Sequence, residues 1–213
     1  MPERLPTDLR REYLKNDLTE NNLTEDPLDL FKGWFNEAMD AGFLDPNAMT
    51  LATADKNGKP SARTVLLKKF DERGFVFYTN YDSRKAIEIA ENPFASLLFY
   101  WDKLERQVRI EGKLEKISHE ESDGYFQTRD YVSRLGAIAS HQSRPLSSRF
   151  SLMRDVAKLM LKYPVKVPLP EYWGGYRLNH EKIEFWQGRK SRLHDRFLYS
   201  RENNGWKAER LYP

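Results

Sequence analysis

Short turns between runs of alternating apolar and polar residues constrain the fold of this chain more than any other feature. The segments 48–55 and 60–70 flank an Asn57-Gly58 turn, and Asn-Gly supplies the positive φ values that a tight hairpin needs. A second turn then leads directly into a strand over 75–79. Three strands joined by such short connections form an antiparallel meander and not a parallel βαβ unit.

The same pattern continues to the end of the chain. A further hairpin is predicted over 94–101 and 104–117, and four more strands over 176–180, 182–187, 195–201 and 206–211. Helices are predicted where a capping residue precedes a run with helical spacing, beginning at Asp26-Pro27, Ser83, Ser118 and Ser148. We therefore expect a mainly β fold, one antiparallel barrel with peripheral helices.

A mobile arm followed by a single domain is expected. Residues 1–25 lack apolar periodicity and are predicted to form a mobile N-terminal arm, while 26–213 form a single barrel domain with helical additions. No apolar run approaches the length of a membrane span, so a cytoplasmic protein that binds no membrane is expected.

Composition excludes several kinds of chemistry. The chain has no cysteine, and its 35 Lys and Arg against 32 Asp and Glu give a net charge of only +3. Thiolate clusters and Cys nucleophiles are thereby ruled out, and nucleic-acid binding is not favoured. The sequence has no phosphate-cradling Gly-rich loop, no GxGxxG after a strand and no histidine spacing suited to a metal, so no metal site is expected.

The most distinctive local pattern is the stretch 183–197. If its second half is extended, Arg192, His194 and Arg196 share one face, because strand side chains alternate with a period of two. Such a cationic stripe suits an anionic ligand, although a solvated strand face would have the same composition. Arg84 and Lys85 after Ser83 predict either a phosphate site at a helix N-terminus or two cations that merely oppose the helix dipole.

Cations and hydroxyl groups form more clusters than a single phosphate requires. Two phosphorylated ligands and a planar aromatic group would account for the clusters at 63–68, 84–85, 125–133, 142–143 and 192–196.

At this level of detail the chain resembles the pyridoxine (pyridoxamine) 5′-phosphate oxidase family of FMN enzymes. The resemblance runs from Arg10 to the C-terminus. It is carried by the motifs Arg10-Arg11-Glu12-Tyr13, Arg63-Thr64-Val65-Leu66-Leu67-Lys68, Phe77-Tyr78-Thr79-Asn80, Ser83-Arg84-Lys85, Leu104-Glu105-Arg106-Gln107-Val108, Trp173-Gly174-Gly175, Glu184-Phe185-Trp186-Gln187-Gly188 and Arg192-Leu193-His194-Asp195-Arg196-Phe197.

The resemblance implies an antiparallel FMN-binding split β-barrel that works as a homodimer with FMN at the interface. The implied reaction is oxidation of pyridoxamine or pyridoxine 5′-phosphate to pyridoxal 5′-phosphate, with O2 as acceptor and H2O2 as product. The flavin would accept the two electrons, which no side chain here can take.

The resemblance also assigns residues to roles. Those implied for FMN are Arg63, Thr64, Val65, Leu66, Leu67, Lys68, Tyr78, Thr79, Arg84, Lys85, Gln107, Gln142, Ser143, Trp186 and Arg196. Those implied for the substrate are Lys68, Tyr125, Arg129, Ser133, Arg192, Leu193 and His194. Arg192 and His194 would lie against the pyridine ring and act in catalysis, and Arg10, Tyr13 and Asp45 would close over the bound substrate.

Two points depend on geometry. Arg63 and Lys68 are five residues apart, so a regular strand would point them to opposite faces; either a bulge intervenes or they serve different ligands or subunits, and we favour the second. Asp130-Tyr131-Val132 also departs from the family pattern, which has a Pro and a basic residue there. Two alternatives stay open, a split-barrel flavin oxidoreductase with another substrate and a non-catalytic protein that binds flavin or pyridoxal phosphate.

Overall fold

The computed structural model of the chain describes residues 12–203 and 205–213, so Arg10 lies outside the described residues. Its α-helices are α1 Pro27–Asp40, α2 Arg84–Glu91, α3 His119–Thr128, α4 Tyr131–Ala139 and α5 Arg149–Lys162. Its strands are β1 Ala48–Ala54, β2 Pro60–Leu66, β3 Lys69–Asp71, β4 Gly74–Asn80, β5 Phe94–Trp101, β6 Arg106–Lys116, β7 Trp173–Gln187, β8 Asp195–Glu202 and β9 Gly205–Arg210. No helix among the described residues is long and apolar enough to cross a membrane.

The four predicted helix starts are confirmed, and all except the one at Ser83 have a side-chain cap. The Asp26 side chain accepts a hydrogen bond from the Leu28 N–H at 2.9 Å, and Pro27 occupies the first turn of α1. The Ser118 hydroxyl accepts from the Glu121 N–H at 3.1 Å at the start of α3. Ser148 caps α5 in the same way, accepting from the Ser151 N–H at 3.1 Å.

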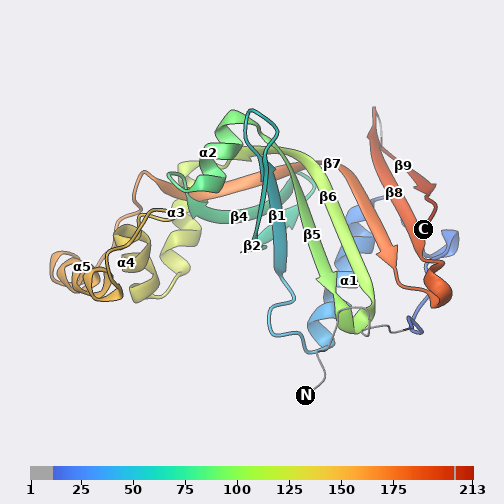
Figure 1. Ribbon diagram of the computed structural model, residues 1–213, viewed down its shortest axis with the longest axis horizontal. Helices are drawn as coiled ribbons and strands as arrows, with labels where there is room; N and C mark the ends of the chain where they lie inside the picture. The colour runs from blue at the N-terminus through green and yellow to red at the C-terminus, as the bar shows by residue number, and fades with distance from the viewer. Residues whose placement is uncertain (1–11, 204) are drawn as a thin grey trace, which may run out of the picture. The chain divides into compact units, whose positions relative to one another are not determined.

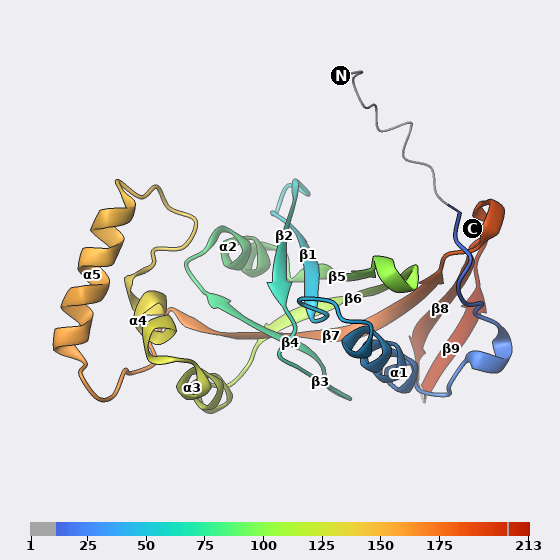
Figure 2. The same cartoon turned by 90° about the horizontal axis from the view of Figure 1, so that it is seen from below.

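The strands hydrogen-bond in the order β2-β1-β5-β6-β7-β4-β3, with β8 pairing β7 and β9. Antiparallel registers join β1 to β2, β3 to β4, β4 to β7, β7 to β8 and β8 to β9. Gly58 has the positive φ, 78°, that was expected in the turn between β1 and β2, whereas the φ of Asn57 is not positive. The two predicted hairpins are therefore confirmed, as β1 with β2 and β3 with β4 (Figures 1 and 2). The single strand predicted over 60–70 is wrong, because it is divided into β2 and β3, which stand at opposite ends of the strand order.

The strands predicted over 176–187 are also wrong in their boundaries. The sequence predicted separate strands over 176–180 and 182–187, whereas β7 runs without interruption from Trp173 to Gln187. The break expected at Glu181 is absent: Leu178 before it pairs with β4, and Lys182 after it pairs with β8.

Contacts along the chain separate it into two compact units. The first combines the described residues up to Asn47 with Leu98–Ile110 and Glu181–Pro213, and the second combines Ala48–Leu97 with Glu111–His180. The expected division into an arm over 1–25 and a single domain over 26–213 stays a prediction.

In the first unit, the segment 12–25 lies along β8 and β9 (Figures 1 and 2). Leu18 is only 1% exposed, and the Tyr199 hydroxyl donates to the Thr24 carbonyl at 3.0 Å. Helix α1 packs Trp34 against Phe185 of β7, with ring centroids 5.2 Å apart. This unit therefore buries aromatic side chains between α1 and the strands.

In the second unit, a separate apolar cluster holds the helices α3, α4 and α5 together (Figure 2). Its buried members are Phe126, Leu135, Val156, Val167 and Trp173. Trp173 is the first residue of β7, so this cluster ties the helices to the sheet. The same junction forms one side of the cavity described next.

Candidate functional site

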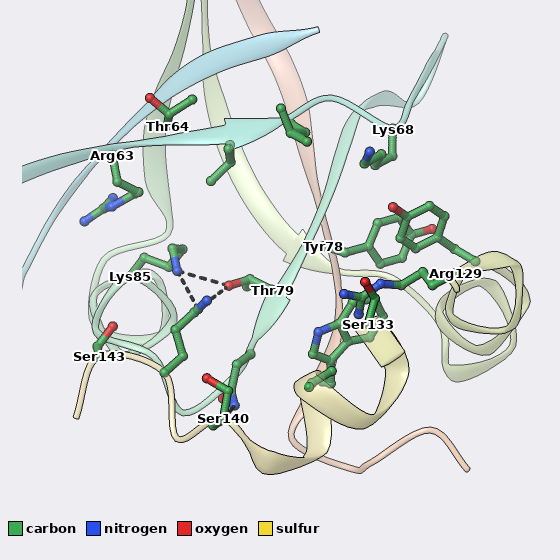
Figure 3. Close-up of a pocket in the computed structure, with 18 of the residues that line it drawn as sticks. Arg63, Thr64, Lys68, Tyr78, Thr79, Lys85, Arg129, Ser133, Ser140 and Ser143 are labelled. Atoms are coloured by element: carbon green, nitrogen blue, oxygen red, sulfur yellow. Dashed lines mark hydrogen bonds between the residues drawn. The ribbon is translucent and has the colours of Figure 1, made fainter. Parts of the chain in front are cut away.

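A cavity of about 1250 Å³ lies within the second unit. Its lining comes from β2, β4, the start of α2, the α3–α4 turn and the loop after α4. The lining residues that the sequence predicted are Arg63, Thr64, Val65, Leu66, Lys68, Tyr78, Thr79, Arg84, Lys85, Tyr125, Arg129, Ser133, Gln142 and Ser143. Figure 3 shows their charged members in two places, with Arg63 and Lys85 on one side and Lys68 and Arg129 on the other.

The first place, which we call the Lys85 end, consists of Arg63, Arg84, Lys85, Gln142 and Ser143. The buried Lys85 ammonium donates to the Thr79 hydroxyl at 3.1 Å and to Gln142 Oε1 at 2.8 Å (Figure 3). Burial, followed by the positive charge of Arg63, lowers the pKa of Lys85 to about 8, while Glu88 opposes the shift. A bound anion would therefore favour the protonated form of Lys85.

The guanidinium of Arg63 is held by four acceptors. Nη1 donates to the Leu51 carbonyl at 3.2 Å and to Thr53 Oγ1 at 2.6 Å. Nη2 donates to Ser61 Oγ and to Glu88 Oε2, the latter at 3.1 Å. These contacts fix the orientation of Arg63 on β2.

The second place, which we call the Arg129 end, consists of Lys68, Tyr125, Arg129 and Ser133. Arg129 lies over the ring of Trp173 at 4.9 Å, and Lys68 lies 5.9 Å from the ring centroid of Tyr125. Burial lowers the pKa of Arg129, against the opposing effects of Tyr125 and Asp130. Arg129 Nη1 is buried and has no hydrogen-bond partner in the described part of the chain. An unpaired buried donor on a cation fits an anionic ligand, because leaving such a group unsatisfied is costly.

The geometric question about Arg63 and Lys68 is settled by an interruption of the strand. β2 ends at Leu66, the Lys68 N–H donates to the Val76 carbonyl at 2.9 Å, and β3 starts at Lys69. Leu67, which was predicted to hold FMN, turns into the core; it is 5% exposed and does not line the cavity. Arg63 and Lys68 consequently line the same cavity. The irregular strand explains how both cations reach one cavity, in which Arg63 lies at the Lys85 end and Lys68 at the Arg129 end; the assignment of the two cations to different ligands stays a prediction.

Asp130, where the sequence departs from the family pattern, is the N-cap of α4. Its carboxylate accepts from the Ser133 N–H at 2.8 Å, and this hydrogen-bonding with Ser133 lowers the pKa of Asp130. The substitution therefore keeps a helix start at Tyr131 and places an anionic side chain in the cavity lining.

The remaining predicted residues belong to the first unit. These are Tyr13, Asp45, Gln107, Trp186, Arg192, Leu193, His194 and Arg196. The predicted cationic face over Arg192, His194 and Arg196 is wrong, because Lys190–Arg192 forms a 3-10 turn and β8 begins only at Asp195. Ser191 and Arg192 have positive φ values of 57° and 63°, which ends the strand-like alternation.

His194 and Arg196 nevertheless have defined partners. His194 Nδ1 accepts from the Arg189 N–H at 3.1 Å, and its ring lies 4.6 Å from Trp186 and 5.4 Å from Tyr13. Burial and the nearby Arg192 lower the pKa of His194, with Asp195 opposing. Arg196 Nε donates to the buried carboxylate of Glu184 at 2.9 Å. Arg192, Leu193 and Asp45 are exposed.

Several site residues were not predicted. Ser61, Asp130, Ser140 and Trp173 line the cavity, and Glu88 binds Arg63 from behind it. Glu88 left a signal in the sequence, since it follows Arg84 by four residues and such pairs meet on a helix. Ser61 lies two residues before Arg63 on β2 and therefore shares its face, which the cationic motif obscured.

The fold and the cavity together define a class, an antiparallel split-barrel protein with cationic groups at two ends of one cavity. Residues 35–162 match the family model for pyridoxamine 5′-phosphate oxidase, and residues 173–213 match the model described as the pyridoxine 5′-phosphate oxidase C-terminal dimerisation region. The chain belongs to the pyridoxamine 5′-phosphate oxidase family. The family resemblance read from the sequence is thus confirmed.

Curated relatives match over nearly the full length. The pyridoxine/pyridoxamine 5′-phosphate oxidase of Rubrobacter xylanophilus is 57% identical, with 100% of both chains covered. That of Gloeothece citriformis is 56% identical, with 97% of both chains covered.

Two solved structures are similar. PhzG from Burkholderia lata 383, in complex with tetrahydrophenazine-1-carboxylic acid, has a TM-score of 0.87 and 34% identity, over 93% of this chain and 99% of its own. A pyridoxamine 5′-phosphate oxidase-related, FMN binding protein from Nostoc punctiforme has a TM-score of 0.70 and 20% identity, over 86% and 97% of the two chains. The second likeness concerns the fold, and it confirms the predicted antiparallel split barrel with peripheral helices.

Proposed function

We propose that this protein is an FMN-dependent oxidase that converts pyridoxamine or pyridoxine 5′-phosphate to pyridoxal 5′-phosphate, with O2 as acceptor and H2O2 as product. The observation that carries the proposal is the unpaired, buried Arg129 Nη1 at one end of a cavity whose other end holds a second set of cations. A phosphorylated substrate and a phosphorylated cofactor together need two such ends. The family membership of the chain supports the same reading.

The Lys85 end fits the phosphate of FMN. Arg63, Arg84 and Lys85 supply positive charge, and Gln142 and Ser143 add polar groups on the loop after α4. Thr64, Val65, Leu66, Tyr78 and Thr79 continue this lining along β2 and β4. When bound, the flavin supplies the two-electron acceptor that the amino acids lack.

The Arg129 end fits the phosphate of the substrate. Lys68 and Arg129 carry the charge, and Ser133 and Tyr125 add hydroxyl groups. By binding the phosphate there, these residues would position the reacting C4′ carbon and neutralise the charge of the phosphate. They would take no part in the bonds that change.

Residues of the first unit complete the proposal. In a homodimer with FMN at the interface, Gln107, Trp186 and Arg196 contribute to the flavin site, and Arg192, Leu193 and His194 lie against the pyridine ring. Tyr13 and Asp45, with Arg10 outside the described residues, close over the substrate. The match of residues 173–213 to a dimerisation region supports the dimer.

His194 is suited to act as a neutral hydrogen-bond donor. Because its Nδ1 accepts the Arg189 N–H, the proton of the neutral ring lies on Nε2. The lowered pKa of His194 favours this neutral form at pH 7. Nε2 can then donate to the substrate, while Arg192 balances charge as hydrogen leaves C4′.

The net reactions balance with the proposed co-substrates. The alcohol loses one hydrogen from C4′ and one from the hydroxyl oxygen. These two hydrogens, with their electrons, reduce O2 to H2O2. The amine additionally takes up water and releases ammonia to give the same aldehyde.

The test is a single preparation of the protein loaded with FMN. Pyridoxamine 5′-phosphate added under air should yield aldehyde and peroxide in equal amounts. A protein that fails to take up FMN, or that holds FMN but leaves both vitamin phosphates unchanged, would refute the proposal. Tetrahydrophenazine-1-carboxylic acid is the comparison substrate, because PhzG is solved with it; its selective oxidation would favour a flavin oxidoreductase with another substrate. A cytoplasmic location remains part of the proposal.

A further inference from the structure

A buried carboxylate lies directly behind the cations of the Lys85 end. Glu88 of α2 is 5% exposed, and four side chains donate hydrogen bonds to it. Oε2 accepts from Thr53 Oγ1 at 2.6 Å, from Ser61 Oγ at 2.5 Å and from Arg63 Nη2 at 3.1 Å. Oε1 accepts from Arg84 Nε at 2.8 Å.

These contacts keep Glu88 ionised. Burial alone would raise its pKa, but hydrogen bonds from Ser61, Thr53, Arg84 and Arg63 outweigh burial and lower the pKa to about 2. A permanent negative charge beside a site for an anion needs an explanation, because its electrostatic effect on a bound phosphate is repulsive.

The geometry provides that explanation. Glu88 joins Arg63 on β2 to Arg84 on α2, so one carboxylate orients guanidinium groups from two elements that line the cavity. The bond to Arg84 uses only Nε, which leaves the Nη edge of this guanidinium for a ligand. The charges also match. Three cations, Arg63, Arg84 and Lys85, less one carboxylate give +2, and a phosphate monoester carries about −1.5 to −2 at pH 7.

We propose that Glu88 is a positioning residue that orients the guanidinium groups of Arg63 and Arg84 toward the ligand at the Lys85 end. Through this orientation, the Lys85 end binds a flavin that has a phosphate in preference to a flavin that lacks one. The proposal rests on the proposed function, since it takes FMN as the ligand of this end. Glu88 itself does not line the cavity, so it acts through the two arginines.

A positioning role of Glu88 and a purely electrostatic role predict opposite changes in FMN affinity. If Glu88 affected the ligand only through its charge, Glu88→Gln would remove a repulsion and tighten FMN binding. If Glu88 orients the arginines, the same substitution weakens FMN binding while leaving riboflavin, which has no phosphate, nearly unaffected. If Glu88 had only a general structural role, Glu88→Gln would weaken the binding of FMN and of riboflavin to the same extent.

The experiment measures the affinities of the full-length protein for FMN and riboflavin by quenching of flavin fluorescence. The wild-type protein should prefer FMN. Glu88→Gln should lower the FMN-to-riboflavin preference about tenfold or more, the size of one lost charge-assisted hydrogen bond. The matched control is Glu91→Gln, on the same helix but exposed, which should leave the preference unchanged.

The outcomes separate this proposal from the proposed function. A wild-type protein that binds neither flavin refutes the proposed function and, with it, the role of Glu88. A wild-type preference for FMN that survives in Glu88→Gln, or increases, overturns the positioning role alone. If Glu88→Gln does not fold, Glu88→Asp gives the same comparison. The shortened side chain keeps the negative charge but withdraws it from the arginines. An unchanged preference for FMN in Glu88→Asp overturns the proposal.

Discussion

The rings of Tyr78 and Tyr125 stack with their centroids 4.0 Å apart and their planes 17° from parallel. Trp173 extends the stack, with its ring 5.5 Å from Tyr78 and inclined by 10°. Burial, reinforced by the negative charge of Glu121, raises the pKa of Tyr78 to about 12, so its phenol stays neutral at physiological pH. The Arg129 end is thus built on an uncharged aromatic stack with cations against it.

Removing the last ring of this stack should destabilise the second unit. Trp173 is 8% exposed and belongs to the buried cluster with Phe126 and Leu135. Trp173→Ala is expected to lower the free energy of unfolding by about 3 to 5 kcal/mol, through lost burial and the cavity that remains. Urea unfolding measures this. Phe150→Ala, at a side chain that is 76% exposed, is the control and should change stability by no more than about 0.5 kcal/mol.

Arg129 should contribute to the binding of the substrate and not to the binding of the flavin. Arg129→Met removes the donor that lacks a partner, and we expect KM for pyridoxamine 5′-phosphate to rise by about ten- to a hundredfold, the range for a lost hydrogen bond to a charged group. FMN affinity should stay close to that of the wild type. Arg154→Ala, at an exposed arginine of α5, serves as the control. An unchanged KM in Arg129→Met would contradict the assignment of this end to the substrate phosphate.

Lys85 should make FMN binding depend on pH. Its pKa of about 8 in the ligand-free protein means that the ammonium is present below this pH and is lost above it. FMN affinity should therefore fall as pH rises from about 8 to 9.5, approaching about tenfold per unit. Lys85→Arg, which stays protonated, should flatten the profile. A fall of the same size in Lys85→Arg would assign the pH dependence to another group.

The lowered pKa of Lys85 also affects stability, with a defined sign. Between about pH 8 and the ordinary value of 10.5, the unfolded chain binds a proton at Lys85 that the folded chain has released. The contribution of this residue to the free energy of unfolding should therefore increase with pH across that window. Denaturant unfolding of wild-type and Lys85→Met proteins at pH 7.5 and pH 10 measures the difference.

Arg192 and His194 should increase kcat. Arg192→Ala and His194→Ala are expected to lower kcat about a hundredfold or more, within the range attributed to a positioned proton-transfer group or electrostatic stabiliser. Both variants should retain FMN, which the flavin absorbance would show. Turnover close to wild type in both variants, with flavin bound, would refute their catalytic role.

Local signals in the sequence predicted the elements well. Helix starts at Asp26-Pro27 and Ser118 depend on hydrogen bonds within a few residues, and the Asn57-Gly58 turn depends on backbone conformation alone. These interactions are complete within the segment that encodes them, so a linear pattern is enough.

The errors arose where distant contacts decide the conformation. Two strands were predicted on either side of Glu181, but pairing with both β4 and β8 keeps β7 extended. The alternation at Arg192 and His194 suggested a strand, but the backbone enters positive φ at Ser191. The role of Glu88 was not apparent, because three of its four donors come from β1 and β2, far along the chain.

The interruption between β2 and β3 has a consequence for how this protein can vary. Inserting or deleting one residue between Arg63 and Lys68 would exchange inward and outward positions and turn one of the two cations away from the cavity. Substitutions at the exposed positions of this segment leave that geometry intact. Along this stretch, natural variants should therefore differ in residue type while keeping the spacing between the two cations fixed.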